Sequence, residues 1–187
     1  MKKLLIIAAL SLISCGEDKK KEEHHHTPVQ NENKAASLSP HTSEMEVIGG
    51  AHIHIDYSAP SVRDRIIFGG LVGYNTVWQA GAHNATWIET DKDLLINGET
   101  LPAGKYGFFV IPGKENWEVI FNSRWEQHGK DDYDEAEDVL RMEVTPDTLS
   151  ETQEQLRYEI EKKSDKEGVI SLAWEKIKIE LPFEVQD

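Results

Sequence analysis

The sequence predicts an all-β protein, folded as a single antiparallel β-sandwich or jelly-roll-like domain over residues 47–187. Short segments in which apolar and polar residues alternate recur along this range, which is the pattern of half-buried strands. Turn signals separate them, above all the hairpin dipeptide Asn97-Gly98 and the pair Pro112-Gly113. Eight or nine short strands at regular spacing are typical of a sandwich or jelly roll.

The chain begins with a pattern typical of bacterial export. Lys2 and Lys3 precede an apolar run from Leu4 to Ile13, which is shorter than the roughly 20 residues of a membrane-spanning helix. Leu12-Ile13-Ser14-Cys15 resembles the lipobox of bacterial lipoproteins, in which diacylglycerol alkylates the cysteine. We therefore expect residues 1–14 to be a signal peptide and Cys15 the site of lipid attachment. The alternative is an ordinary cleaved signal followed by an incidental cysteine.

Two further features concern where the lipid would hold the protein. Cys15 is the only cysteine, so its thiol has no partner for an intrachain disulfide. Several acyl chains, palmitate among them, would anchor the protein stably. Gly16 rather than aspartate follows Cys15, so the usual inner-membrane retention signal is missing and we expect an outer-membrane lipoprotein. Glu17-Asp18 resembles the surface-export signals of some Gram-negative groups. The sequence therefore does not decide whether the protein faces the periplasm or the cell surface.

Residues 15–46 are expected to form a lipidated cysteine followed by a flexible, charged tether. The segment has almost no large apolar side chains, so it cannot bury enough surface to offset the entropy of ordering. From Val47 onward the alternation begins. Strands are predicted over residues 51–57, 86–90, 94–96, 106–111, 117–121, 139–144, 156–160, 169–174 and 177–181. The short apolar run of residues 66–68, closed by Gly69-Gly70, is a further candidate.

Three stretches of the predicted domain depart from simple alternation. Residues 106–111 are apolar on both faces, as expected of a central strand between two layers. Apolar residues occupy even positions up to Trp174 and odd positions from Ile177, so we expect a bulge or bend near Glu175-Lys176. Only Thr148 to Leu156 has a helix-like pattern, and it is weak.

Several motifs go beyond generic strand patterning. They are YSAPSVRDR (residues 57–65), FGGLVGY (68–74), GAHNAT (81–86), LPAGKY (101–106) and WEVIFN (117–122). Together they resemble an uncharacterised family, domain of unknown function 2911, over about residues 50–180. The resemblance implies an exported or lipid-anchored envelope protein and brings no reaction with it. The chain departs from the family pattern at Gly73-Tyr74-Asn75, at Gln79-Ala80, and at His83 and Asn84, so a site built on the usual residues there would be altered.

Composition excludes some partners. The chain carries 20 basic and 34 acidic residues, and loss of Lys2 and Lys3 with the signal takes the net charge from −14 to about −16. Such a surface repels phosphate backbones and anionic headgroups. We therefore expect no nucleic-acid partner, and we expect membrane contact through the lipid alone.

One group of residues is predicted to form a binding face. Arg63 and Arg65 alternate with Asp64, so we expect them to share one strand face. Two guanidiniums side by side can hold a carboxylate, phosphate or sulfate. The alternative is that they pair with the domain's own acids. Trp117 and Trp174 lie within apolar alternation and are expected in the core, whereas polar neighbours favour ligand stacking by Trp78 and Trp125. The candidate binding face comprises Arg63, Arg65, Trp78, His83, Asn84 and Trp125.

A metal site is the alternative chemistry. His52, His54 and Asp56 share one strand face, a spacing that can present two imidazoles and a carboxylate to one ion. His83 or His128 would complete the ligand set. Histidines on a solvated strand face are also ordinary polar surface.

These observations leave three hypotheses open. The first is a non-catalytic, lipid-anchored envelope module that binds a small molecule, glycan or protein, and it requires no cofactor. The second is a metal-dependent enzyme built on the His/Asp cluster. The third is a structural role in envelope assembly. The sequence carries no nucleophile elbow, phosphate-binding glycine loop or zinc-protease motif, which favours binding over catalysis.

Overall fold

Ten strands and one 3₁₀ turn make up the regular structure of residues 37–186, the part of the chain that the computed structural model describes. None of its helical segments is long and apolar enough to span a membrane. The predicted signal peptide, Cys15 and the tether up to residue 36 lie outside the described residues. The elements are β1 (His41–Ile48), β2 (Ala51–Ser58), β3 (Trp87–Thr90), β4 (Leu94–Ile96), β5 (Glu99–Leu101), β6 (Gly104–Ile111), β7 (Trp117–Asn122), η1 (Glu135–Glu137), β8 (Asp138–Val144), β9 (Asp147–Lys162) and β10 (Glu167–Val185).

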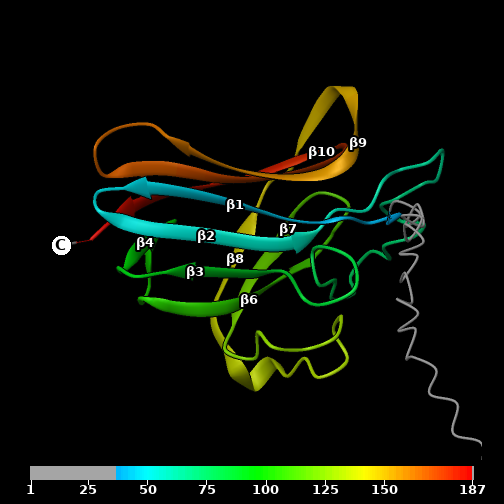
Figure 1. Ribbon diagram of the computed structural model, residues 1–187. Helices are drawn as coiled ribbons and strands as arrows, with labels where there is room; N and C mark the ends of the chain where they lie inside the picture. Colours follow the sequence, from blue (N-terminus) through cyan, green and yellow to red (C-terminus); the bar gives the residue numbers. More distant parts are fainter. Residues whose placement is uncertain (1–36, 187) are drawn as a thin grey trace, which may run out of the picture. The chain divides into compact units, whose positions relative to one another are not determined.

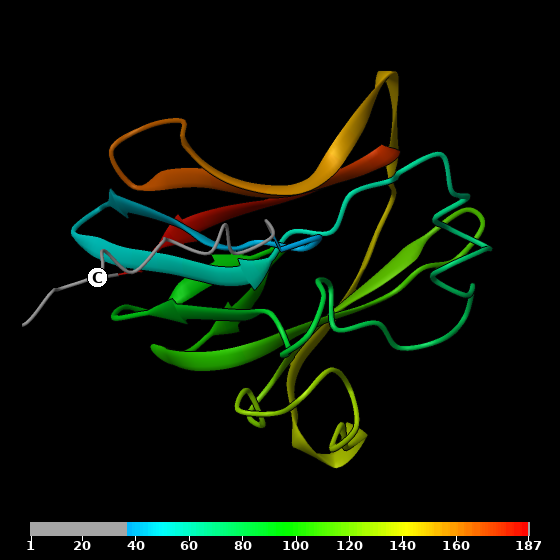
Figure 2. The same cartoon turned by 45° about the vertical axis from the view of Figure 1, so that its right-hand side comes forward.

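The strands form two antiparallel sheets that pack face to face, which confirms the predicted all-β sandwich (Figures 1 and 2). A six-stranded sheet has the order β1-β2-β3-β6-β7-β8, and a four-stranded sheet has the order β5-β4-β10-β9. The hairpin predicted at Asn97-Gly98 joins β4 to β5, and both residues have the positive φ that its turn requires.

Alternation along the strands builds the core. In β2 the side chains of Ala51, Ile53 and Ile55 are fully buried between the sheets, whereas the residues between them face outward. The central strand β6 is buried on both faces, as predicted. Phe108 packs between the sheets, and Phe109 joins a small outer cluster beneath the segment 123–137.

A bulge interrupts the pairing of β10 with β9 at the predicted place. The register shifts on both sides of Glu175, whose φ is 56°, so the apolar face changes from even to odd positions. The two strands expected here are therefore one 19-residue strand. Trp174 and Trp117 lie in the core at 1% and 2% exposure, as predicted.

Three sequence-based boundaries were wrong. Thr148 to Leu156 is part of strand β9 and not a helix. The sequence did not show this because β9 is an edge strand, and its largely polar residues hide the apolar alternation of a strand. Residues 66–68 form turns within the long β2–β3 connection. β1 begins at His41, so residues 41–46 belong to the domain and not to the tether. β1 is also an edge strand, and its mostly exposed side chains give the sequence little hydrophobic signal.

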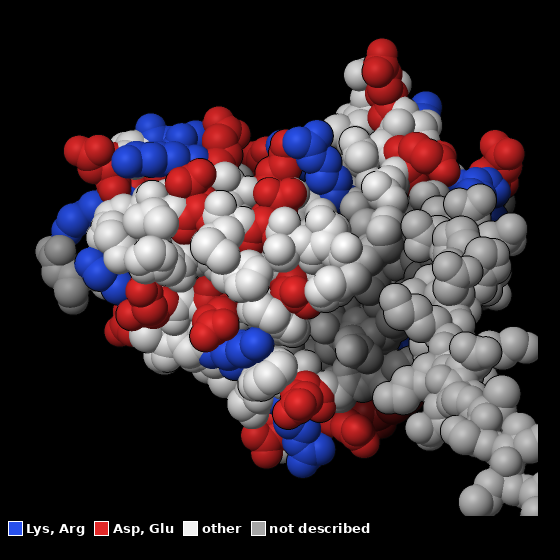
Figure 3. Space-filling model, in the orientation of Figure 1, with Lys and Arg blue, Asp and Glu red and all other residues white. Residues whose placement is uncertain are grey.

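The long connection between β2 and β3, residues 59–86, projects at the end of the sandwich where β1 begins, away from the C-terminus (Figures 1 and 2). We call it the β2–β3 loop. Elsewhere, acidic and basic side chains are interspersed with uncharged ones on the visible face, so the negative charge there is spread rather than gathered (Figure 3).

Candidate functional site

A pocket of about 370 Å³ lies against the β2–β3 loop. Its polar lining comes from Arg63, Arg65, His83 and Lys130, and its apolar lining includes Leu71, Val72, Val77, Trp78 and Trp174. We call it the cationic pocket. The loop supplies most of the lining, β10 supplies Trp174, the segment after β7 supplies Lys130, and Ser39 comes from the residues before β1. The site therefore depends on four separate parts of the chain.

The first half of the β2–β3 loop is fixed by hydrogen bonds to the four-stranded sheet. The amide of Val62 donates to the carbonyl of Glu154 at 2.7 Å, and the amide of Leu156 donates to the carbonyl of Pro60 at 2.9 Å. The carboxylate of Glu175 accepts from the amide of Ile67 at 3.3 Å. Because Glu175 is the bulge residue of β10, the phase change visible in the sequence helps to position this loop.

The second half of the loop is fixed to the core. Trp78 exchanges backbone hydrogen bonds with Val110 of β6 at 2.8 and 2.9 Å. The carbonyl of Ala80 accepts from the Tyr158 hydroxyl at 2.8 Å and from the Thr86 hydroxyl at 3.0 Å. Burial raises the pKa of Tyr158 well above its ordinary value, so this hydroxyl remains a neutral donor at physiological pH. Both ends of the pocket wall are thus held rigidly.

Backbone strain is concentrated in this loop. Of the seven non-glycine residues with positive φ in the described range, five belong to it, with φ between 48° and 62°. Left-handed backbone costs an ordinary L-residue roughly 1–2 kcal/mol, and such costs cluster where function requires a particular geometry. Strain points to the loop as the functional part of the domain. The five residues are Arg63, Asp64, Asn75, Ala80 and His83.

The cations of the pocket have no acidic partners. Arg65 donates through Nε to the carbonyl of Val62 at 3.0 Å and through Nη2 to that of Ser61 at 2.6 Å. Lys130 Nζ donates to the carbonyl of Val77 at 2.8 Å. No aspartate or glutamate lines the pocket, and none of Arg63, Arg65 and Lys130 takes part in an ion pair within residues 37–186. The arginine side chains thus form no ion pair with the domain's acids in the described range, although the carboxylate of Glu154 accepts from the backbone amide of Arg63 at 3.0 Å.

Trp78 and Trp174 form the aromatic wall. Their rings stack at 5.6 Å with an interplanar angle of 24°, and Trp78 Nε1 donates to the carbonyl of Gly81 at 3.0 Å. Trp78 is 6% exposed and its ring is stacked on that of Trp174, so it offers little free surface for the predicted ligand stacking. Trp174 Nε1 is the one buried side-chain nitrogen or oxygen in the described range that lacks a hydrogen-bond partner. An unsatisfied buried donor costs about 1–3 kcal/mol.

The predicted binding face divides between two pockets. Arg63, Arg65, Trp78 and His83 meet in the cationic pocket, although the arginines lie on a left-handed turn and not on the strand that was expected. The other two predicted residues, Asn84 and Trp125, line a second pocket of about 410 Å³ with Trp87, Asp56 and His128.

A lysine holds the tryptophans of the second pocket in place. Lys105 Nζ lies 3.4 Å from the ring centroid of Trp87 and 3.9 Å from that of Trp125. The Lys105 ammonium thus forms favourable cation–π contacts with both indole rings. We call this hollow the tryptophan pocket.

The proposed metal cluster does not assemble. Within residues 37–186, no three histidine, cysteine, aspartate or glutamate side chains are arranged to hold a metal ion. Asp56 instead pairs with His41 of β1 at 3.1 Å, and the ring of His54 packs edge-on against Trp87 at 4.8 Å. His83 and His128 line different pockets. Alternation placed the strand residues on one face correctly, but Asp56 and His54 contact side chains from other strands instead of sharing a metal ion.

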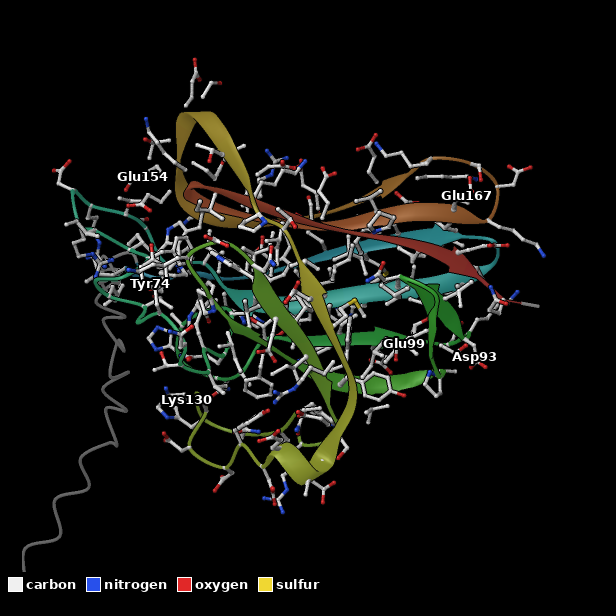
Figure 4. The ribbon with its side chains drawn as sticks, turned by 180° about the vertical axis from the view of Figure 1, so that it is seen from behind. Tyr74, Asp93, Glu99, Lys130, Glu154 and Glu167 are labelled. Atoms are coloured by element: carbon white, nitrogen blue, oxygen red, sulfur yellow. The ribbon has the colours of Figure 1, made fainter. Side chains whose placement is uncertain are left out.

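Sequence reasoning missed two residues that shape the cationic pocket. Lys130 stands just before an acidic run, and nothing in its local sequence indicates that it reaches Val77. Trp174 was correctly predicted to be buried, but its role as a pocket wall depends on the packing of β10 against the loop. Figure 4 shows Lys130 with Tyr74 and Glu154 at one end of the domain, opposite Asp93, Glu99 and Glu167.

Comparison with known proteins places the chain in a family. No curated protein and no solved structure matches it significantly. One family, described as "Protein of unknown function (DUF2911)", matches residues 39–183. This range contains strands β1 to β9 and every residue that lines the cationic pocket, and it ends within β10. The chain therefore belongs to the DUF2911 family.

Proposed function

We propose that this protein is a lipid-anchored protein of the bacterial envelope that binds a small anionic ligand in the cationic pocket without transforming it. The anchor would be the lipidated Cys15, held in the outer membrane. The ligand would carry a carboxylate, phosphate or sulfate group and an apolar part. The proposal joins the export pattern of the sequence to the chemistry of one pocket.

One observation carries the assignment of the ligand. In a chain of net charge −14, a pocket lined by two arginines and a lysine contains no carboxylate. A folded acidic protein tends to neutralise its cations with nearby acids, and their absence from the lining leaves a local positive potential. Arginine guanidiniums bind oxyanions through two parallel hydrogen bonds, so Arg63 and Arg65 are the groups that would hold the charge.

The apolar residues of the pocket lining are the reason for proposing that the ligand also has an apolar part. Val72 and Trp174 are buried side chains of the pocket lining, and Leu71, another lining residue, is exposed. An apolar wall next to fixed cations suits an amphiphilic anion better than a bare inorganic ion. We assign binding rather than catalysis because guanidiniums keep their protons at neutral pH and so do not exchange them with a substrate.

The test is a calorimetric titration of the full-length chain, purified in detergent, with phenyl phosphate as the probe. We expect binding that weakens with added salt and that falls about tenfold or more in the variant Arg63→Gln/Arg65→Gln, since a charge-assisted hydrogen bond contributes about 1.5–3 kcal/mol. Arg157→Gln is the matched control, because it removes an exposed arginine outside the pocket. Absence of binding to phenyl phosphate, phenyl sulfate and benzoate alike would sink the assignment.

The anchor has its own test. Mass spectrometry of the protein isolated from membranes should find residues 1–14 removed and acyl chains on Cys15. An intact leader or a free thiol at residue 15 would contradict the lipoprotein part of the proposal, and it would leave the titration result unaffected.

A further inference from the structure

Large apolar side chains are exposed along one short stretch of the β2–β3 loop. Residues 66–74, which we call the loop tip, contain Ile66 at 73%, Leu71 at 54% and Tyr74 at 36% exposure. In the described range only four other large hydrophobic residues are exposed, and they lie on β1, on β8 or just before β1. Single exposed apolar residues are common on protein surfaces. Several in one short segment indicate a surface that binds a membrane, a ligand or another protein.

The loop tip is a fixed structure and not a loose excursion. The amide of Leu71 donates to the carbonyl of Ile66 at 3.0 Å, and the amide of Gly69 donates to that of Val72 at 2.7 Å. Beneath these bonds Ile67, Phe68 and Val72 are buried in the main core. The buried residues anchor the loop tip, so the fold itself holds the exposed side chains out into solvent.

On the pocket side, the loop tip lies beside cations. Leu71 lines the same pocket as Arg63, Arg65 and Lys130, and no carboxylate lines that pocket. An apolar tip beside unpaired cations fits the boundary of an anionic bilayer, where acyl chains meet headgroup phosphates. Charges more than about 8–10 Å away are largely screened at physiological salt. The nearer acids, Asp64, Glu154 and Glu175, line a separate hollow and not the cationic pocket.

The chain enters the domain at this end. Ser39, near the start of the described range, lines the cationic pocket beside the loop tip. From Cys15 to Ser37 the chain advances 22 positions, which span at most about 75 Å even when fully extended. A chain of this length attached at this end of the sandwich allows the loop tip to reach the bilayer in which Cys15 is anchored.

We propose that the loop tip docks on the anionic bilayer that carries the lipid anchor. Ile66, Leu71 and Tyr74 enter the interface, while Arg63 and Arg65 contact lipid phosphates. The mouth of the cationic pocket then faces the membrane. This inference rests on the lipid anchoring proposed above, and it replaces the expectation that the acyl chains are the protein's only contact with the membrane.

The experiment uses the full-length, acylated chain in nanodiscs, with the environment-sensitive fluorophore NBD on a single introduced cysteine. Leu71→Cys reports on the loop tip, and Val139→Cys, 42% exposed on β8, is the matched control. In discs of mixed phosphatidylglycerol and phosphatidylcholine, we expect blue-shifted emission at residue 71, with iodide quenching reduced about twofold or more. We expect neither change at residue 139.

Two further comparisons test the cause. Adding Arg63→Gln/Arg65→Gln to the Leu71→Cys chain, or replacing the anionic discs by pure phosphatidylcholine, should reverse most of the shift. Equal spectra at residues 71 and 139 would overturn the docking, and so would an equal shift in neutral discs. A shift that grows with the number of chains per disc would assign the loop tip to a second copy and overturn it as well.

Failure of the anchor is recognised separately. In the unmodified chain, NBD should not react, because Cys15 is acylated. Labelling at Cys15, located by mass spectrometry, would overturn the lipoprotein proposal and the docking together. An unreactive Cys15 combined with unshifted emission at residue 71 would overturn the docking alone.

Discussion

The hydrogen bonds that hold the pocket wall predict a measurable coupling between two buried hydroxyls. Tyr158 and Thr86 are both fully buried, and both donate to the carbonyl oxygen of Ala80, itself fully buried. Tyr158→Phe or Thr86→Val alone leaves that oxygen with one donor. Each variant should therefore lose only the net value of one hydrogen bond, about 1 kcal/mol in the free energy of unfolding.

The double variant Tyr158→Phe/Thr86→Val has a different consequence. It leaves the Ala80 carbonyl buried without a partner, which adds a desolvation penalty of about 1–3 kcal/mol. The loss in the double variant should thus exceed the sum of the two single losses by about 1 kcal/mol or more. For a domain of this size, each kcal/mol corresponds to a Tm change of about 2–4 °C.

Urea unfolding of the four chains measures this coupling directly. The m value should stay constant, because the surface exposed on unfolding does not change. Tyr74→Phe serves as the control, since Tyr74 is exposed at the loop tip and its loss of a hydroxyl should not alter stability. Additivity of the two single variants within about 0.5 kcal/mol would refute the shared-acceptor reasoning.

Two further predictions concern pH and the tryptophan pocket. Burial and then the hydrogen bond to Asp138 raise the pKa of Tyr133 from 10.0 to about 12, so the folded state keeps a proton that the unfolded state loses. The resulting stability, about 1–2 kcal/mol after allowing for partial exposure, is present below pH 10 and lost as pH rises through 12. In unfolding curves Tyr133→Phe should lose less stability over that window than the wild type, and parallel losses would contradict this. Trp125→Ala should leave calorimetric binding of phenyl phosphate unchanged, because Trp125 lines the tryptophan pocket only; a weaker affinity would mean that the two pockets are coupled.

Much of the fold could be predicted because the strands near the middle of each sheet are half-buried or fully buried. β2 and β6 show their burial as a period of two or as a continuous apolar run, and β10 shows its bulge as a change of phase. The edge strands β1 and β9 could not be recognised so well, since most of their side chains face solvent and carry no hydrophobic pattern.

The candidate site was only partly predictable for a related reason. Arg63, Arg65, Trp78 and His83 come from one segment, and nearness in sequence was enough to group them. Lys130 comes from a segment whose position is set by packing on the outer face of β6. The arginines were expected on a strand, but positive φ at Arg63 and at its neighbour turns the chain there.

The sequence by itself determined the fold class, the core of the central strands, the bulge of β10 and the family, because these follow from local patterns of side chains along the chain. Tertiary structure alone decided that three cations share a pocket without a carboxylate, that His54 and Asp56 on β2 contact other side chains, and that the loop tip is held out into solvent. Those features depend on distances between segments far apart in sequence. No local pattern records such distances, since they are fixed only when the two sheets pack and the β2–β3 loop closes over their end.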